Sequence, residues 1–296
     1  MRRSEISILI PAYNYICLPL VQSIQRQAAN LGIQYEIIVA DDGSTRHETI
    51  AANKSINTLD ACRFIRREVN VGRSAIRNFL VQESRFQWLL FMDCDMEMGS
   101  PTFLQHYIEA EDGDVIDGGI AIGGDCHQWK HNLRYQYERQ CAPQHTAAER
   151  TKHPYRSFRT TNFMVRREVM LSHPFDERFL HYGYEDVLFG KRLRQHGLSI
   201  LHIDNPLLLT DYESNPVFVA KTEESLRTLY QFRDDLKGYS TLLTFIEGIH
   251  LPIIKSVFRM GHFLFGRLER QCLCGNHPHL TLFKFYKLGY YLHIKN

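Results

Sequence analysis

Four short apolar runs, separated by segments long enough for helices, constrain the fold of this chain more than any other feature. They are ISILIPAY (6–13), YEIIVADD (35–42), CRFIRR (62–67) and WLLFMD (88–93). Runs of this length and composition predict buried strands. Strands that alternate with helices predict an α/β domain whose central sheet is mostly parallel and flanked by helices.

The composition excludes several classes of protein. With 44% hydrophobic and 23% charged residues, the 296-residue chain can bury a full core. The formal net charge of +2 argues against nucleic acid as a partner, because a duplex-binding surface needs clustered basic residues. The seven cysteines include no C-x-x-C pair, and the first residues lack the apolar region and cleavage site of a signal peptide. We therefore expect a cytoplasmic protein with reduced thiols.

Two of the predicted strands end in acidic residues. Asp41 and Asp42 end the second apolar run, and Asp93 and Asp95 follow the fourth. In open α/β sheets, ligands bind at the carboxyl ends of the strands. Two closely spaced carboxylates suit Mg²⁺ or Mn²⁺, so Asp93 and Asp95 predict a cation site of the kind that bridges phosphates. The segment 41–44 is explained equally well as a turn with a helix cap.

The segment NVGRSAIRN (70–78) follows the third predicted strand. A helix is expected from Ser74, and Arg73 and Arg77 lie four residues apart, so they share a helix face. Cationic side chains near a helix N-terminus suit a diphosphate, although two ordinary surface arginines also fit the pattern. Neither a G-x-G-x-x-G motif after the first run nor a P-loop motif is present, which argues against hydride transfer and P-loop chemistry.

The second half contains FDERFLHYGYEDVLFGKRLRQHG (175–197). Its apolar spacing predicts a helix from Asp186 to a stop at Gly197. Acidic residues at a helix N-terminus are favoured by the helix dipole, and this explains Glu185 as well as a functional role does. For Asp186 we favour function, because RTTNFMVRRE (159–168) precedes it as a predicted strand that would form an acceptor-binding wall.

Seven segments, in order, resemble the family 2 glycosyltransferases of the GT-A fold. They are IPAYN, VADDGS, NVGRSAIRN, FMDCDM, TTNFMVRRE, FDERFLHYGYEDVLFGKRL and NPVFVAKTEESL, and the resemblance runs from about Ile6 to about Leu229. The resemblance implies an inverting enzyme that moves a hexosyl or N-acetylhexosaminyl group from a nucleotide-sugar donor, most often a UDP-sugar. The acceptor would be a glycan or a lipid-linked glycan in surface polysaccharide synthesis.

The same resemblance implies roles for particular residues. Nucleotide and donor binding falls to Pro11, Ala12, Tyr13, Asp42, Arg73, Arg77 and Asp93, with Asp42 accepting a hydrogen bond from the base. Asp93 and Asp95 would hold Mn²⁺ or Mg²⁺. Asp186 takes the place of the catalytic base, and Glu185 would help to hold the acceptor sugar.

The sequence departs from the family pattern at Leu209, where many relatives carry a histidine that completes the metal site. Leucine cannot ligate a cation. Asp211 or His202 could substitute, or the metal could keep more water in its shell. The departure also leaves a second hypothesis open, a non-catalytic partner subunit that binds a nucleotide sugar.

We expect a catalytic domain over residues 1–235, with a nucleotide-binding half (1–98) and an acceptor-binding half (99–235), followed by a helical extension (236–296). From 249 to 296, seven Lys or Arg stand against one acid, Glu269, among many aromatic residues. This mixture suits a helical segment lying peripherally on the inner face of the cell membrane. Packing on the catalytic domain or a dimer interface explains it nearly as well.

Overall fold

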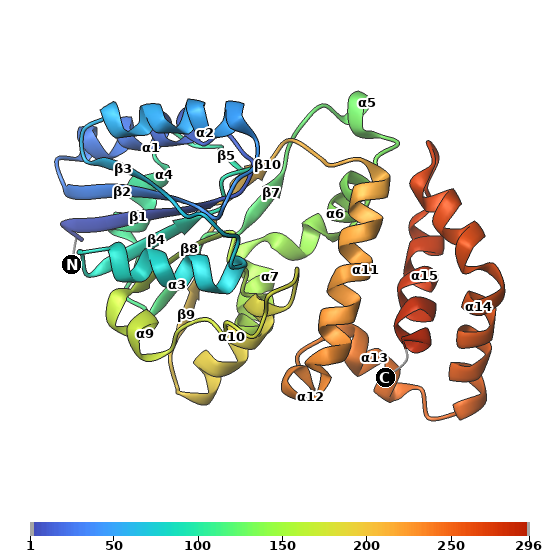
Figure 1. The fold of residues 1–296 in the computed structure, drawn as a ribbon. Helices are drawn as coiled ribbons and strands as arrows, with labels where there is room; N and C mark the ends of the chain where they lie inside the picture. The colour runs from blue at the N-terminus through green and yellow to red at the C-terminus, as the bar shows by residue number, and fades with distance from the viewer. Residues whose placement is uncertain (1–2, 295–296) are drawn as a thin grey trace.

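A computed structural model of the chain describes residues 3–294, which form a sheet flanked by helices and a separate layer of C-terminal helices (Figure 1). The main sheet has seven strands in the order β3-β2-β1-β4-β8-β6-β9. Their bounds are β1 Glu5–Ala12, β2 Gln34–Asp41, β3 Cys62–Arg66, β4 Trp88–Met92, β6 Val115–Asp117, β8 Asn162–Arg166 and β9 Ile200–His202. The four predicted strands are thus confirmed as β1 to β4, each end within one residue of its expected place.

The main sheet is parallel except at β8. Strands β3, β2, β1 and β4 pair in parallel, whereas β8 pairs antiparallel with both β4 and β6. In the register of β1 and β2, Ala12 lies opposite Asp41, and Asp41 lies opposite Arg66 of β3. The carboxyl ends of the first strands therefore meet at one edge, which is where the sequence placed its acidic residues.

Both faces of the main sheet are buried, which explains why the apolar runs are unbroken rather than alternating. Ile8 and Ile10 of β1 point to one core, with side chains of helices α1 (Leu18–Leu31) and α4 (Phe103–Glu109). Leu9 points to the other core, with α3 (Arg73–Glu83), α9 (Arg167–Ser172) and α10 (Glu185–Gln195). The predicted α/β fold with helices on both faces is confirmed.

A second, smaller sheet and several short helices complete the part of the chain that precedes the C-terminal helices. The second sheet has the order β5-β10-β7. Its strands are β5 Glu97–Met98, β7 Ile120–Ile122 and β10 Leu207–Leu209. The remaining helices of this part are α2 His47–Lys54, α5 Cys126–Trp129, α6 Leu133–Cys141, α7 Ala147–Thr151 and α8 Pro154–Ser157, with short 3₁₀ helices at Ser55–Thr58 and Ala142–His145.

The C-terminal helices confirm a helical extension. The extension expected at 236–296 contains α13 Thr241–Gly248, α14 Pro252–Cys274 and α15 Leu280–His293, and it is preceded by α11 Asn215–Gln231 and α12 Arg233–Leu236. Helix α11 stands between the sheet and the hairpin of α14 and α15, and α14 forms the outer edge of the molecule (Figure 1). Within residues 3–294, the helices are all too short or too polar to cross a membrane. Lys295 of the basic series lies outside the described residues.

Candidate active site

A cleft of about 1440 Å³ opens at the carboxyl ends of β1, β2 and β4 and runs toward the C-terminal helices. Its walls include the ten residues that the resemblance assigned to the donor, the cation or the acceptor: Pro11, Ala12, Tyr13, Asp42, Arg73, Arg77, Asp93, Asp95, Glu185 and Asp186. Asp211 is exposed outside this lining, although its charge reaches Tyr15 on the cleft wall. The fold thus gathers residues from distant segments into one site.

Asp42 holds the loop that leads into α3. Its two carboxylate oxygens accept hydrogen bonds from the backbone N–H groups of Val71 (2.9 Å) and Gly72 (3.0 Å). Burial raises the pKa of Asp42, and these two amide donors oppose that shift. Gly72 has φ +88°, a conformation that glycine adopts without strain, and it precedes the first residue of α3. The contact of Asp42 with a nucleotide base stays a prediction.

The loop after β2 also contains the predicted turn. Asp41 accepts a hydrogen bond from the backbone N–H of Ser44 at 2.9 Å. Gly43 has φ +75°, and a Cβ at this position would lie 2.6 Å from the backbone nitrogen of Asn70. No side chain fits there, so this glycine lets the loops after β2 and β3 touch beneath the cleft.

Arg77 connects the two acidic parts of the site. Its side chain is only 2% exposed, and its guanidinium donates to Oδ1 of Asp93 at 2.8 Å. The same guanidinium lies 3.7 Å from Oε1 of Glu185, whose side chain is 5% exposed. Arg73, one turn earlier on α3, is 4.0 Å from the same oxygen and stays half exposed. The shared helix face is confirmed, but the surface alternative is wrong for Arg77.

Asp93 and Asp95 follow β4 with their side chains in the cleft. Arg77 engages one oxygen of Asp93, whereas Asp95 is exposed. The surrounding walls of the cleft raise the pKa of Asp95 by desolvation, although part of its side chain is exposed, and the neighbouring Asp93 carboxylate adds to the shift. This mutual repulsion is what a bound cation would relieve, and oxygen ligands of this kind suit Mg²⁺ and Mn²⁺. Two carboxylates therefore fit such an ion, with phosphates and water as further ligands.

Within residues 3–294, a third protein ligand for a cation does not lie beside Asp93 and Asp95. No group of three His, Cys, Asp or Glu side chains suited to a metal occurs within residues 3–294. Leu209 is the last residue of β10, is 2% exposed and belongs to the hydrophobic core. His202 is buried: its Nδ1 lies 2.8 Å from Arg150, and its Nε2 lies 3.0 Å from the carbonyl oxygen of Pro154. Because both ring nitrogens are engaged and His202 does not line the cleft, His202 is excluded as a substitute ligand.

Glu185 and Asp186 begin α10 at a sharp bend of the chain. Gly183 has φ +100° and Tyr184 φ +70°, and the second value is uncommon for a residue with a side chain. Strained backbone of this kind is concentrated at functional sites. The bend directs Glu185 to Arg77 and leaves Asp186 half-buried on the cleft wall. The helix dipole favours both carboxylates, yet it does not require this bend.

The surroundings of Asp186 give it the properties of a base. Burial raises the pKa of Asp186 to about 6, the Glu185 carboxylate adds to the shift, and Arg159 opposes it. One oxygen accepts the backbone N–H of Val187 at 2.8 Å. The other is not held by a hydrogen bond from residues 3–294. A carboxylate with a pKa near the working pH is suited to accept a proton.

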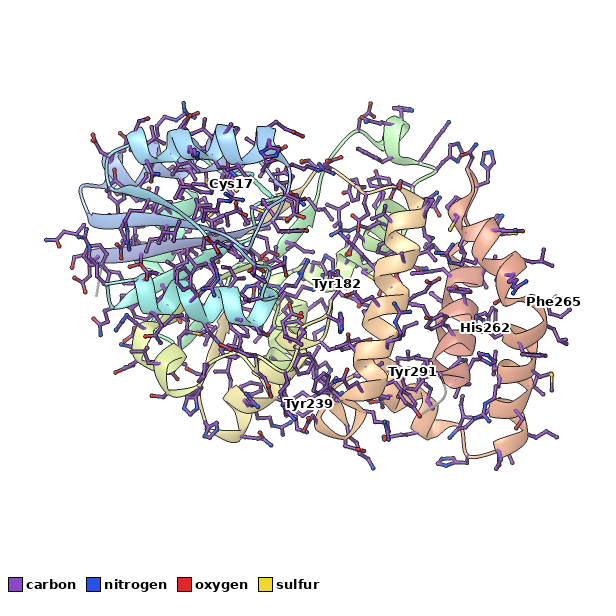
Figure 2. The ribbon with its side chains drawn as sticks, viewed as in Figure 1. Cys17, Tyr182, Tyr239, His262, Phe265 and Tyr291 are labelled. Carbon is purple, nitrogen blue, oxygen red and sulfur yellow. The ribbon has the colours of Figure 1, made fainter. Side chains whose placement is uncertain are left out.

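Several cleft residues were missed by the sequence reasoning. Tyr182 lies between the sheet and α11 (Figure 2), and the guanidinium of Arg73 stacks 4.5 Å from its ring centroid. Arg134 also lines the cleft, and its guanidinium pairs with Glu213. The resemblance included the segment that contains Tyr182, but nothing in its pattern distinguished this tyrosine from its neighbours. Further parts of the wall come from α6 to α8 and from α13 to α15, which lie outside the segments that carried the resemblance.

The comparisons with known proteins agree with this fold and cleft. The family description "Glycosyl transferase family 2" matches residues 7–173. Among curated proteins, a chondroitin synthase of Pasteurella multocida is 26% identical over 234 residues, covering 67% of this chain and 24% of that protein. A chondroitin synthase of Escherichia coli is 24% identical over 239 residues, covering 68% and 34%. The chain therefore matches only about a quarter to a third of the length of these relatives.

Solved structures show the same fold at low identity. S. aureus TarS 1–349 in complex with UDP has a TM-score of 0.52 and 18% identity, covering 97% of this chain and 89% of that one. The Pyrobaculum calidifontis mannosyltransferase PcManGT, in complex with GDP-Man and Mn²⁺, has a TM-score of 0.57 and 11% identity, covering 97% and 84%. The fold and cleft define a glycosyltransferase of the GT-A type. The chain belongs to glycosyl transferase family 2.

Proposed function

We propose that this glycosyltransferase moves a sugar, with inversion, from a nucleoside-diphosphate donor to a saccharide or lipid-linked saccharide in polysaccharide synthesis. The observation that carries the proposal is the meeting of Asp93, Asp95 and Asp186 in one cleft, from the end of β4 and the start of α10. A UDP-sugar carrying a hexosyl or N-acetylhexosaminyl group is the favoured donor, since TarS was solved with UDP and with UDP-GlcNAc.

In this proposal, the residues of the cleft have different roles in donor binding and catalysis. Pro11, Ala12, Tyr13 and Asp42 border the nucleotide at the ends of β1 and β2, and Arg73 and Arg77 line the diphosphate. Asp186 removes the proton from an acceptor hydroxyl as that oxygen attacks the anomeric carbon. The bond from that carbon to the diphosphate breaks at the same time, and the proton stays on Asp186. Attack from the face opposite the leaving group inverts the configuration.

Asp93 and Asp95 would hold Mn²⁺ or Mg²⁺, and Asp211 would be a further ligand if its loop moved closer. Arg77 fixes the orientation of Asp93, so that Asp95 is the carboxylate that remains open to solvent. When bound, such a cation neutralises charge on the departing nucleoside diphosphate. Leu209 adds no ligand, and the ion would therefore depend on donor phosphates to complete its shell.

The first test is a nucleotide-release assay over a panel of sugar nucleotides with Mn²⁺ or Mg²⁺, repeated with chelator. We expect release from one donor, loss of release with chelator, and a higher Mn²⁺ requirement in Asp95→Asn, because this substitution removes an anionic ligand. The matched control is Asp125→Asn, an exposed carboxylate outside the cleft lining. Equal metal dependence in Asp95→Asn and wild type would contradict the assignment of Asp95.

The second candidate function is a non-catalytic partner subunit that binds a nucleotide sugar. Leu209 favours it, because this residue takes away a metal ligand that many relatives possess. The two candidates differ in turnover. The partner subunit would bind a sugar nucleotide tightly in calorimetry and release no nucleotide, with or without an acceptor.

One exposed apolar surface of the C-terminal extension supports the proposal that the protein lies peripherally on a membrane. Helix α14 presents five apolar side chains, all at least 58% exposed, at the helical spacing i, i+4, i+7, i+11 and i+15: Ile253, Val257, Met260, Leu264 and Leu268. We call this surface the α14 outer face. Figure 2 places Phe265 at the outer edge of α14 and His262 on the side of α15, against Tyr286 and Tyr290. The inward side of the helix thus carries His262 together with Phe258 and Leu273, and a second, apolar side faces outward.

An anionic lipid bilayer fits the α14 outer face better than a second copy of the chain. Residues 249–296 carry seven basic side chains and one acid, so two such hairpins would repel each other. Anionic lipid headgroups attract Lys and Arg, while exposed Val, Leu and Met enter the boundary between headgroups and acyl chains.

Replacing Val257 and Leu264 together with Glu should abolish sedimentation with phosphatidylglycerol vesicles and leave the melting temperature unchanged, since both side chains are exposed. Leu171→Glu on α9, which exposes a similar apolar side chain elsewhere, is the control. If the double variant binds vesicles normally but elutes as a smaller species than wild type, the surface is a contact between copies.

A further inference from the structure

The far end of the cleft is built by the C-terminal helices and has a chemistry unlike the donor end. Its apolar lining comes from Phe245 of α13, Phe258 of α14, and Phe285 and Leu288 of α15. Lys284 and Lys287 of α15 line the same region. Lys287 and Leu288 follow Lys284 by three and four residues, so both neighbour Lys284 on the surface of α15.

Lys287 is the central charge of this region. Its Nζ lies 4.6 Å from the ring centroid of Tyr137 and 4.7 Å from that of Phe283. Burial lowers the pKa of Lys287. Within residues 3–294, neither Lys284 nor Lys287 forms an ion pair with a carboxylate. A half-buried ammonium held by aromatic rings alone lacks the anionic partner that such a group usually has.

The other charged groups of this wall are mostly cationic. Arg156 and Arg159 line it, and Arg159 lies 3.9 Å from Glu138, the one acid whose charge reaches Lys287. His145 adds no negative charge, because burial and the neighbouring arginines lower its pKa to about 4 and keep it neutral. In this part of the cleft wall, the four cations Arg156, Arg159, Lys284 and Lys287 therefore outnumber the carboxylate of Glu138.

The region is continuous with the catalytic position. Arg159 is electrically coupled both to Asp186 and to Glu138 and Tyr137 on α6. Lys287 in turn contacts Tyr137. An acceptor whose hydroxyl reaches Asp186 would therefore extend past Arg159 toward Lys287 and Lys284, and then to Phe245 and Phe285, which are 57% and 51% exposed.

We propose that Lys284 and Lys287, with Phe245, Phe258 and Phe285, form an acceptor subsite for the phosphate or diphosphate ester of a long apolar chain. The inference rests on the proposed function, since it assigns the subsite to the acceptor. The lysines bind the phosphate oxygens by charge-assisted hydrogen bonds. The aromatic side chains cover the first carbons of the chain, whose remainder leaves at the exposed rim. An anionic glycan would use the lysines but not the apolar rim.

Farnesyl diphosphate is the probe, titrated by calorimetry below its micelle concentration with UDP and Mn²⁺ saturating, so that the donor position is filled. We expect saturable binding that the Lys284→Gln/Lys287→Met variant weakens at least about tenfold, the loss expected for contacts to charged groups. Asp186→Asn should bind the probe as wild type does, so that a failure of catalysis is separated from a failure of this subsite. Lys54→Gln, an exposed lysine of α2, is the control.

Binding of three further ligands separates the phosphate, apolar and glycan parts of the proposal. Inorganic diphosphate and farnesol should each bind more weakly than farnesyl diphosphate. Equal affinity for inorganic and farnesyl diphosphate would overturn the apolar part, and unchanged affinity in the double variant would overturn the subsite. Lysine-dependent binding of a chondroitin tetrasaccharide, without binding of farnesyl diphosphate, would replace the lipid by an acidic glycan. If the double variant does not fold, Lys284→Glu, an exposed change, provides the same comparison.

Discussion

Replacing Asp186 with asparagine should lower kcat for sugar transfer by about 10²- to 10⁴-fold, the contribution of a positioned general base. UDP affinity should stay unchanged, because Asp186 lies at the start of α10 and the nucleotide is expected at the ends of β1 and β2. The fold should also be kept, since the asparagine oxygen can still accept the backbone N–H of Val187. The measurement is initial rates of nucleotide release beside calorimetry with UDP.

The control for this variant is Asp234→Asn, which removes the same charge from an exposed position on α12. It should retain full activity. If Asp186→Asn transferred sugar at the wild-type rate, Asp186 would not be the base, and its bend at Tyr184 would need another explanation.

The same role predicts how the wild type responds to pH. The pKa of Asp186 is raised to about 6, so the carboxyl is protonated below this value and cannot accept a proton from the acceptor. kcat/KM should therefore rise with pH through about 6 and level off above it, because kcat/KM reports the groups of the free enzyme. A profile that is flat from pH 5 to 8 would argue against a base with this pKa.

Replacing Arg77 with methionine should destabilise the protein by about 3–5 kcal/mol, the effect of removing one partner from a buried ion pair. Arg77 is 2% exposed, and it lies against Asp93 and the 5% exposed Glu185. Methionine keeps much of the volume but leaves Glu185 buried, with only the half-exposed Arg73 close to it. The measurement is urea unfolding followed by circular dichroism, where the midpoint should fall with an unchanged slope.

Arg73→Met is the matched control, since Arg73 shares the helix face and approaches the same Glu185 oxygen at 4.0 Å. Its side chain is 46% exposed, so its loss should cost less than about 1 kcal/mol. Both variants should weaken donor binding. Similar losses in the free energy of unfolding of the two variants would mean that the burial of Arg77 does not determine how much its ion pairs stabilise the protein.

The local features of the site could be predicted from the sequence because short segments determine them. The apolar run of β4 and its terminal Asp93 and Asp95 are adjacent in the chain, as are Gly72 and the start of α3. Parallel strands then bring their carboxyl ends to one edge, which is a general property of such sheets. The helix at 185–195 was placed within one residue of its start, by its apolar spacing and by Gly197.

The long-range features could not be predicted in the same way. The burial of Arg77 depends on Glu185, more than one hundred residues away, and α3 alone looks like a helix with a solvated face. The apolar residues of α14 suggested a helix, but only its packing on α15 reveals that the apolar side faces outward. His202 was considered as a ligand because its type is suitable, whereas its buried contacts with Arg150 decide against it.

The most direct test of the central claim is the configuration of the sugar that is first released from an α-linked UDP-sugar. The donor is the one selected in the release assay, with water as acceptor, and the anomeric protons are followed by NMR before mutarotation. A single displacement with Asp186 as base predicts that the β-anomer appears first, at a rate that Asp186→Asn strongly reduces. An α-anomer as the first product would contradict an inverting transferase.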